Sequence, residues 1–278
     1  MPELPEVEVT RRGLLHRLSG RTILQVGWSG KRLRTALPRT LLRRHLTDGR
    51  IRTIDRRAKY LLIRMEDGAV LVLHLGMTGR CAVLPETTLR HKHDHLFLLL
   101  DNDMEFRFND SRRFGSVALW PPAQALQLEE SFSNKEGIEP LGEDFSPERL
   151  LALAGKRTIP IKTFLMNSRI IAGIGNIYAN EILFACQINP LHPASGLTPH
   201  HWHRIVEETR RILHQAIEAG GSSISDFLGT SGQPGYFQLQ LKAYGRTGEP
   251  CPECSTALIK TVLSGRATYH CPVCQQAP

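Results

Sequence analysis

The sequence predicts an α+β protein with a β-rich first half behind a leading helix, a helical second lobe and a short cysteine-rich module near its end. Three observations support this. The first half carries short runs of β-branched and large apolar residues, helical periodicity begins near Ile161, and four of the six cysteines form two CxxC pairs. With 278 residues, 41% of them hydrophobic, the chain is long enough to bury a core in each lobe.

The leading helix is expected from Pro5 to about Leu18, because Pro5 suits a first helical turn and Ser19-Gly20 provides a stop. Removal of the initiator Met would leave Pro2 with a free secondary amine. An α-amino group titrates near pH ~8, so a fraction of this amine is neutral and nucleophilic in a cell. Glu3 places a carboxyl group beside it. The alternative is that the prolines only start the helix.

Six short apolar runs in the first half predict antiparallel strands in a sandwich or barrel. Turn signals such as Glu66-Asp67-Gly68 and Asp101-Asn102-Asp103 separate them. The expected strands are Thr22–Trp28, Arg50–Arg56, Tyr60–Met65, Ala69–Leu75, His95–Leu100 and Met104–Phe108.

Trp120-Pro121-Pro122 ends the β pattern, and the acidic stretch after it indicates a connecting region with some helix and turn. The clearest later helices are Asn176–Gln187 and Thr198–Ala219; Thr198-Pro199 starts the second, and Gly220-Gly221 ends it. We therefore divide the chain into residues 1–122, 123–155, 156–238 and 239–278.

Charge is segregated along the chain. The net charge is +8, and residues 31–64 hold 12 Lys or Arg against the two acids Asp48 and Asp55. Residues 123–155 hold seven acids against Lys135 and Arg149. A basic lobe makes a polyanionic partner the leading expectation, although a generically basic protein would show the same net charge. No apolar run reaches the length of a membrane span, so we expect no membrane partner.

The cysteine module is the most specific local pattern. Cys251-Pro-Glu-Cys254 and Cys271-Pro-Val-Cys274 are separated by 16 residues, a spacing typical of a four-thiolate zinc ribbon. Four thiolates leave no open coordination position, so we expect one structural zinc ion. Cysteines used in this way also indicate a reducing compartment. Cys81 and Cys186 are left over, with packing as their default role.

Other motifs have both a functional and a structural interpretation. The glycines before Asn176 could bring backbone close to a phosphate at a helix N-terminus, or they could form a tight turn between helices. Lys59 could be catalytic or one more basic surface residue. Arg266, at the tip of the predicted cysteine hairpin, could reach a phosphate or an active site or be an ordinary exposed charge. Met77 and Phe114, on glycine-bearing loops, could be core residues or wedges that unstack a base step.

Together these motifs resemble the formamidopyrimidine-DNA glycosylase family of base-excision repair enzymes, and the resemblance covers essentially the whole chain. The matching segments are Met1–Val7, Arg56–Tyr60, His74–Gly79, Lys92–His95, Asp110–Gly115, Gly173–Tyr178, Pro234–Phe237 and the four-cysteine finger. The resemblance implies an N-terminal β-sandwich, a helix–two-turn–helix domain and a zinc finger, with duplex DNA bound between the lobes.

It also implies roles for single residues. Pro2 would attack C1′ of the damaged nucleotide and form a Schiff base, while Glu3 would protonate the sugar ring oxygen. Lys59 would be the acid/base of β-elimination, and Arg266 would assist δ-elimination. The expected reaction excises an oxidised purine, such as 8-oxoguanine or a formamidopyrimidine. It then cleaves the DNA backbone at the same nucleotide.

The remaining implied residues contact DNA. Met77, Arg112 and Phe114 match the three residues that fill the gap left by the extruded base. The loop Ser222–Phe237, with Ser222, Ser223 and Tyr236, matches the segment that closes over that base. Positions that match or lie near phosphate contacts are His93, Arg112, Arg113, Arg157, Lys162 and Asn176.

Two departures from the family pattern are Ser111, where proline is common, and Ser225, where a basic residue is common. Two alternatives are an endonuclease VIII-type glycosylase for oxidised pyrimidines and a non-catalytic zinc-finger protein that binds damaged DNA. The resemblance further implies a monomer in the bacterial cytoplasm, associated with the nucleoid through DNA. Lesion ranking, opposite-base preference and the contacts of the base pocket do not follow from the sequence.

Overall fold

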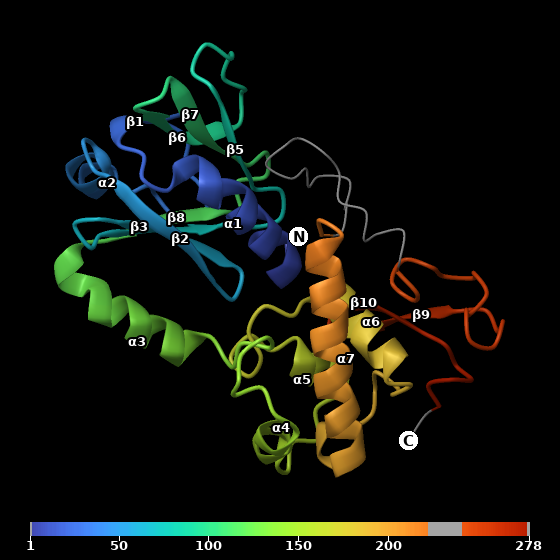
Figure 1. The fold of residues 1–278 in the computed structure, drawn as a ribbon. Helices are drawn as coiled ribbons and strands as arrows, with labels where there is room; N and C mark the ends of the chain where they lie inside the picture. The colour runs from blue at the N-terminus through green and yellow to red at the C-terminus, as the bar shows by residue number, and fades with distance from the viewer. Residues whose placement is uncertain (1, 222–240, 277–278) are drawn as a thin grey trace. The chain divides into compact units, whose positions relative to one another are not determined.

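The computed structural model describes residues 2–221 and 241–276 and divides the chain into two compact units (Figure 1). The first unit comprises Met1–Ser133 with Ala219–Gln238, and the second comprises Asn134–Glu218 with Leu239–Pro278.

The first unit contains two four-stranded sheets in which every pairing is antiparallel. One sheet has the order β1-β6-β7-β5, and the other has the order β2-β3-β4-β8. Their strands are β1 (Ile23–Trp28), β2 (Ile51–Arg57), β3 (Tyr60–Met65), β4 (Val70–His74), β5 (Arg80–Pro85), β6 (Asp94–Leu100), β7 (Met104–Asn109) and β8 (Ser116–Trp120).

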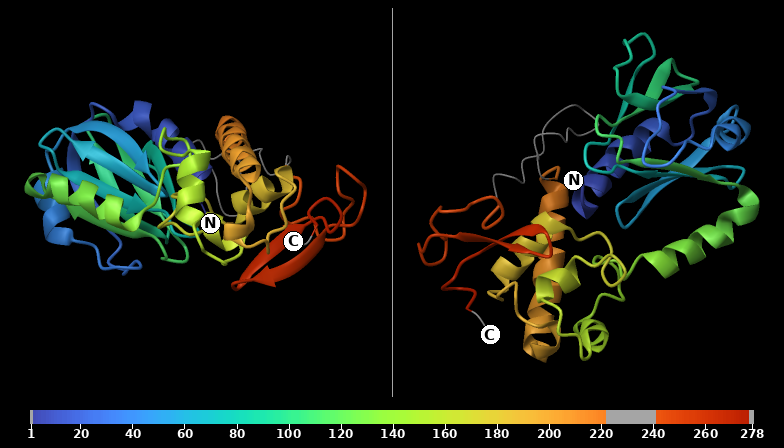
Figure 2. Two further views of the ribbon diagram at one scale, coloured as in Figure 1. Left: turned by 90° about the horizontal axis from the view of Figure 1, so that it is seen from below. Right: turned by 180° about the vertical axis from the view of Figure 1, so that it is seen from behind.

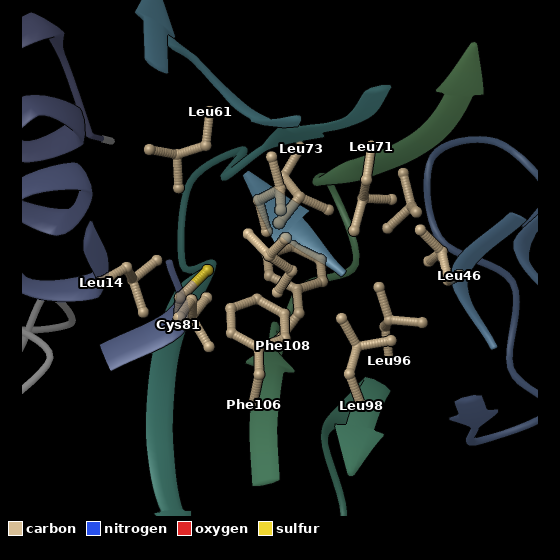
Figure 3. Packing of buried hydrophobic residues seen from close by; sticks show 14 of the residues in the cluster. Leu14, Leu46, Leu61, Leu71, Leu73, Cys81, Leu96, Leu98, Phe106 and Phe108 are labelled. Atoms are coloured by element: carbon tan, nitrogen blue, oxygen red, sulfur yellow. The ribbon is translucent and has the colours of Figure 1, made fainter. Parts of the chain in front are cut away.

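The core of this unit fills the space between the two sheets. Phe106 and Phe108 of β7 are fully buried, and they pack among leucines from both sheets and from α1 (Leu4–Leu18), as Figure 3 shows. Burying one such side chain contributes about 1.5–3 kcal/mol. This core fixes the strand ends on which the candidate site is built. The predicted sandwich with a leading helix is therefore confirmed.

Two further helices belong to the first unit. The helix α2 (Arg39–Leu46) anchors itself with Leu42 and Leu46, one turn apart. The helix α3 (Ala125–Lys135) packs Leu128 and Phe132 against Leu62, Val70 and Val72 of the second sheet. These contacts join α3 to the sandwich.

The second unit is built around α6 (Asn176–Ala185) and α7 (Pro199–Glu218), the two helices expected from the sequence. Two shorter helices, α4 (Pro147–Ala154) and α5 (Ile161–Leu165), complete the helical part together with a 3-10 turn at Ala194–Gly196. Trp202 of α7 is fully buried, and its ring meets that of Phe164 with centroids 5.5 Å apart.

The cysteine module forms a hairpin of β9 (Ile259–Leu263) and β10 (Arg266–His270), and β10 packs on α6 (Figure 2). The Tyr269 N–H donates to Asn180 Oδ1 at 2.8 Å, and Gln275 Nε2 donates to the Ile188 carbonyl at 2.8 Å. Buried Glu181 accepts the N–H groups of Lys242, Ala243 and Tyr244. The finger and the helices therefore pack together within one compact unit.

Cys81 and Cys186 are buried, and burial raises the pKa of both thiols, that of Cys186 to about 12. Both are packing residues. No helix in residues 2–221 and 241–276 is long and apolar enough to cross a membrane.

Candidate functional site

The N-terminal segment holds Pro2 and Glu3 at the start of α1. Both residues are buried, and Glu3 is the N-cap residue. A reciprocal capping box locks it: the Glu3 N–H donates to Glu6 Oε2 at 2.8 Å, and the Glu3 side chain accepts the N–H of Glu6. The residue that carries the expected amine is therefore attached directly to a rigid helix end.

The end of β2 lies beside the first turns of α1 (Figure 1). Arg56 Nε lies 3.4 Å from Glu8 Oε2, and Arg11 Nη1 donates to the Ile54 carbonyl at 3.3 Å. The two-residue turn Ala58-Lys59 then joins β2 to β3, with Ala58 at φ 52°. The lysine expected for acid/base chemistry thus lies at the tip of a hairpin that α1 braces.

His74 lies next to this hairpin at the end of β4. Its ring packs on Tyr60 with centroids 4.8 Å apart, and its Nδ1 accepts the Gly76 N–H at 3.1 Å. Burial, and then the positive charges of Lys59 and Arg34, lower the pKa of His74 to about 4. The imidazole of His74 is therefore uncharged at neutral pH and adds no positive charge beside Lys59.

The two glycine-bearing loops that carry Met77, Arg112 and Phe114 are packed backbone to backbone. A Cβ on Gly76 would lie 2.4 Å from the Gly115 nitrogen, so only glycine fits there. Phe114 is 46% exposed, and the Arg112 guanidinium lies 4.8 Å from the centre of its ring. Met77 is half-buried. The structure brings the three residues into one two-loop assembly.

Asp110, which sequence reasoning did not single out, joins these two loops. It is fully buried; its Oδ1 accepts the Thr78 hydroxyl at 2.6 Å, and its Oδ2 accepts the Gly115 N–H at 2.7 Å. The Thr78 oxygen in turn accepts the Arg112 N–H at 3.1 Å. One carboxylate therefore fixes the loops of Met77, Arg112 and Phe114.

We expect Asp110→Asn to lower the free energy of unfolding by about 1–3 kcal/mol, because an amide offers one acceptor oxygen and leaves a buried donor unsatisfied. The measurement is urea denaturation with the m-value checked for constancy. Asp103→Asn is the matched control, because Asp103 is exposed in a left-handed turn that asparagine tolerates. Equal stability of the two variants would contradict this role of Asp110.

The loop before β6 carries His93, which is half-buried. Buried Arg107 fixes this loop by donating to the carbonyls of Thr88 and Leu89, and it pairs with Glu105 at 2.6 Å. Asp94 accepts the His91 N–H at 2.7 Å. His93 therefore projects from a braced loop of the first unit.

In the second unit, Asn176 begins α6 directly after Gly175. Its Nδ2 donates to the Ala267 carbonyl at 3.0 Å, and its buried Oδ1 has no hydrogen-bond partner within the described residues. The ammonium of Lys162 donates to the same carbonyl at 2.7 Å and to Thr268 Oγ1 at 2.8 Å. Lys162 is 1% exposed, so its ammonium holds the hairpin of Arg266 from inside.

Arg266 opens β10 with an exposed side chain and lines a hollow of about 330 Å³ with Lys162 and Ser264. Arg113 and Arg157 are exposed, the first at φ 58°. Ser222, Ser223 and Tyr236 lie outside the described residues. Gly221 precedes them at φ 82°, and a Cβ there would lie 3.3 Å from Glu6 Cγ.

The four finger cysteines can hold a metal ion, because their sulfur atoms all lie within 4.8 Å of one another. The Cys251–Cys274 and Cys254–Cys271 sulfur pairs are 3.9 and 3.5 Å apart. Zinc–thiolate bonds of about 2.3 Å in a tetrahedron place the sulfurs about 3.8 Å apart. The donor set therefore fits one structural zinc ion, as predicted.

The fold combines an antiparallel β-sandwich unit with a helical unit that carries a four-cysteine hairpin suited to zinc. Three family models match the chain: the formamidopyrimidine-DNA glycosylase N-terminal domain over residues 1–117, the H2TH domain of the same enzyme over residues 137–228, and the zinc finger found in FPG and IleRS over residues 248–277.

A formamidopyrimidine-DNA glycosylase of Hahella chejuensis is 44% identical over 99% of this chain and 100% of its own length. One from Stutzerimonas stutzeri is 43% identical with the same coverage. A Lactococcus lactis Fpg in complex with DNA containing an abasic site superposes with a TM-score of 0.89 at 35% identity, covering 99% of this chain and 100% of the other. The chain belongs to the formamidopyrimidine-DNA glycosylase family.

Proposed function

We propose that this protein is a bifunctional DNA glycosylase and abasic-site lyase of base-excision repair. It excises oxidised purines such as 8-oxoguanine and formamidopyrimidines from duplex DNA and then cuts the backbone by β,δ-elimination. The position of Pro2 supports this proposal most directly, because it puts the amine beside a carboxyl group on a rigid helix end in a chain of this family. Solved relatives hold DNA with an abasic site or with carbocyclic 8-oxo-G.

Base release begins when the neutral Pro2 nitrogen attacks C1′ of the flipped nucleotide. The C1′–N bond breaks, and the base leaves with that electron pair and with the proton that the attacking Pro2 nitrogen gives up. The C1′–O4′ bond then opens as O4′ receives a proton from Glu3, which leaves a positively charged imine between Pro2 and C1′. This covalent intermediate divides one difficult displacement into two easier steps.

Strand cleavage follows from the same imine, which acidifies the C2′–H bond. We assign to Lys59 the acid/base role in β-elimination, in which the C2′ proton is removed and the C3′–O bond breaks. Arg266 assists the second elimination, which breaks the C5′–O bond. The zinc ion supplies only structural support for the finger that carries Arg266. All reacting groups are then organic side chains or the N-terminal amine.

The base must leave the stack before C1′ can react, so we assign to Met77, Arg112 and Phe114 the task of filling the resulting gap. Phosphate contacts come from His93, Arg113, Arg157 and Asn176, and they make binding salt-dependent. We also propose Lys162 as a phosphate contact. Its first role is structural, because its ammonium donates to the finger hairpin. Ser222, Ser223 and Tyr236 would cover the flipped base.

A cleavage assay with two duplexes tests this function. We expect rapid nicking of DNA with 8-oxoguanine opposite cytosine and slower nicking of DNA with thymine glycol. A clear preference for thymine glycol would favour an endonuclease VIII-type specificity. Binding of both duplexes without nicking would favour a non-catalytic damage-binding protein.

A Lactococcus lactis relative solved with oxidised-pyrimidine DNA makes the second duplex a necessary part of the assay. We place the activity in the bacterial cytoplasm, where the enzyme would meet the nucleoid as a monomer.

A further inference from the structure

The helix α2 presents a basic surface that none of the roles above uses. We define the α2 patch as Trp28, Arg39, Arg43 and Arg44, which with Thr40 line a hollow of about 440 Å³. The three arginines are exposed, and Trp28 is half-buried at the end of β1. The opposite face of α2 is anchored by Leu42 and Leu46, so the orientation of the arginines is fixed by the fold.

The positive charges of the α2 patch are not neutralised by acidic side chains in the part of the chain that the structure describes. None of its three arginines forms an ion pair with another described residue, and the Arg39 guanidinium donates to the Gly30 carbonyl at 3.4 Å. Residues 29–47 contain six Lys or Arg and no acid. Two acids lie close to the C-terminal end of α2: Asp48 follows the helix in sequence, and an Asp67 oxygen lies 3.5 Å from His45 Nδ1. A row of unpaired guanidinium groups is suited to an anionic ligand.

Trp28 holds two of these guanidinium groups in place. The guanidinium carbon atoms (Cζ) of Arg39 and Arg43 lie 5.5 and 5.4 Å from the centre of its ring, within the range of cation–π contacts. A stacked guanidinium keeps its donors directed outward and loses less side-chain entropy when it binds. The patch is therefore organised for binding before a ligand arrives.

The segment that leads from Trp28 into α2 is hydrogen-bonded to the loops to which we assign DNA contacts. Ser29, next to Trp28, hydrogen-bonds His95 Nδ1 at 2.8 Å, and the ring of His95 lies 6.3 Å from that of His93. The loop from β1 to α2 also reaches the wedge loops, as we name the two loops that carry Met77, Arg112 and Phe114, because the Arg34 N–H donates to the Gly115 carbonyl at 3.1 Å. Lys31 and Arg32 in this loop are exposed. A basic path thus connects the wedge loops and His93 to α2 within the first unit.

We propose that the α2 patch binds the phosphate backbone of duplex DNA that flanks the lesion, an inference that rests on the proposed function for the location of the lesion. Phosphate suits the planar donor fork of arginine, and a duplex offers phosphates at regular spacing beyond the flipped nucleotide. An acidic protein segment would also complement the charge. Continuity with the wedge and His93 loops favours DNA.

The experiment measures how the affinity for undamaged duplexes of about 10 to 30 base pairs depends on salt. In the variant Arg39→Gln/Arg43→Gln, the slope of log K against log salt should become shallower by about 2 on the long duplex, since each lost phosphate contact contributes about 0.9. The affinity ratio of parent to variant should therefore shrink about tenfold between 50 and 200 mM salt. Arg39→Lys/Arg43→Lys keeps the charges and should keep the parental slope.

The matched control is Arg52→Gln/Arg149→Gln, which removes the same charge from exposed positions outside the patch and should keep most of the parental slope. The proposal would be overturned if Arg39→Gln/Arg43→Gln had the same slope of log K against log salt as the parent at every duplex length. Loss of polyglutamate binding by that variant, with DNA binding intact, would overturn it in favour of a protein partner. Failure of the parent to nick lesion DNA would refute the proposed function alone, because the salt slopes use undamaged duplexes.

Discussion

Replacing Pro2 with glycine is expected to lower the rate of base release by about 100-fold or more. Glycine keeps an N-terminal amine, but it loses the ring that holds the nitrogen against the buried first turn of α1. Misplacing a reacting group by about 1 Å can cost about 100-fold in rate. The measurement is single-turnover excision of 8-oxoguanine from a duplex, with the free base and the nicked strand quantified separately.

Pro85→Gly is the matched control, because Pro85 is exposed at the end of β5 and distant in sequence from the amine. It should excise the base at the parental rate. A second variant with a bulky residue at position 2 would retain Met1 and should be as inactive as Pro2→Gly. Parental rates in both position-2 variants would show that the N-terminal amine is not the nucleophile.

Removal of the zinc ion is expected to abolish strand cleavage and to unfold the finger. Apparent zinc-binding free energies in isolated fingers are about 10–16 kcal/mol, which exceeds the stability that a small hairpin has alone. The hairpin has little apolar core of its own, because Val262 is 73% exposed and the buried cluster of the finger is small, with Ala243, Leu258, two cysteines and Phe184. The measurement combines chelation, metal analysis and hydrogen exchange of residues 251–274.

Restoring zinc should restore both exchange protection and cleavage. Cys274→Ser should behave as the chelated protein does, whereas Cys186→Ser should retain one zinc ion per chain, since Cys186 is buried and is not one of the four clustered sulfurs. Full cleavage activity in protein shown to be free of zinc would contradict a structural role for the metal in presenting Arg266.

Local patterns predicted the elements that carry the site. Pro5 and Ser19 bounded the first helix within a residue of its observed ends, and the CxxC spacing identified the metal ligands. Our strand assignment missed β5 and β8, and it also missed the pair Leu42 and Leu46, whose spacing of four residues is a helical signal for α2. Short elements with few buried residues produce weak periodicity.

Tertiary contacts could not be predicted in this way. Asp110 and Thr78 are 32 residues apart, so their hydrogen bond depends on the packing of two sheets. Lys162 resembled a DNA contact by sequence, but its burial against β10 depends on how the finger docks on the helices. The membership of α3 in the first unit follows from Phe132 packing on the outer face of a sheet, a face that the sequence does not identify.

The most direct test of the central claim is borohydride trapping followed by mass spectrometry of the N-terminal peptide. During cleavage of 8-oxoguanine DNA, reduction of the imine should fix the opened sugar to the nitrogen of Pro2, in a peptide that lacks Met1. An adduct on the side chain of Lys59, or a reaction that cleaves DNA without any trapped adduct, would contradict the claim that the Pro2 amine is the nucleophile.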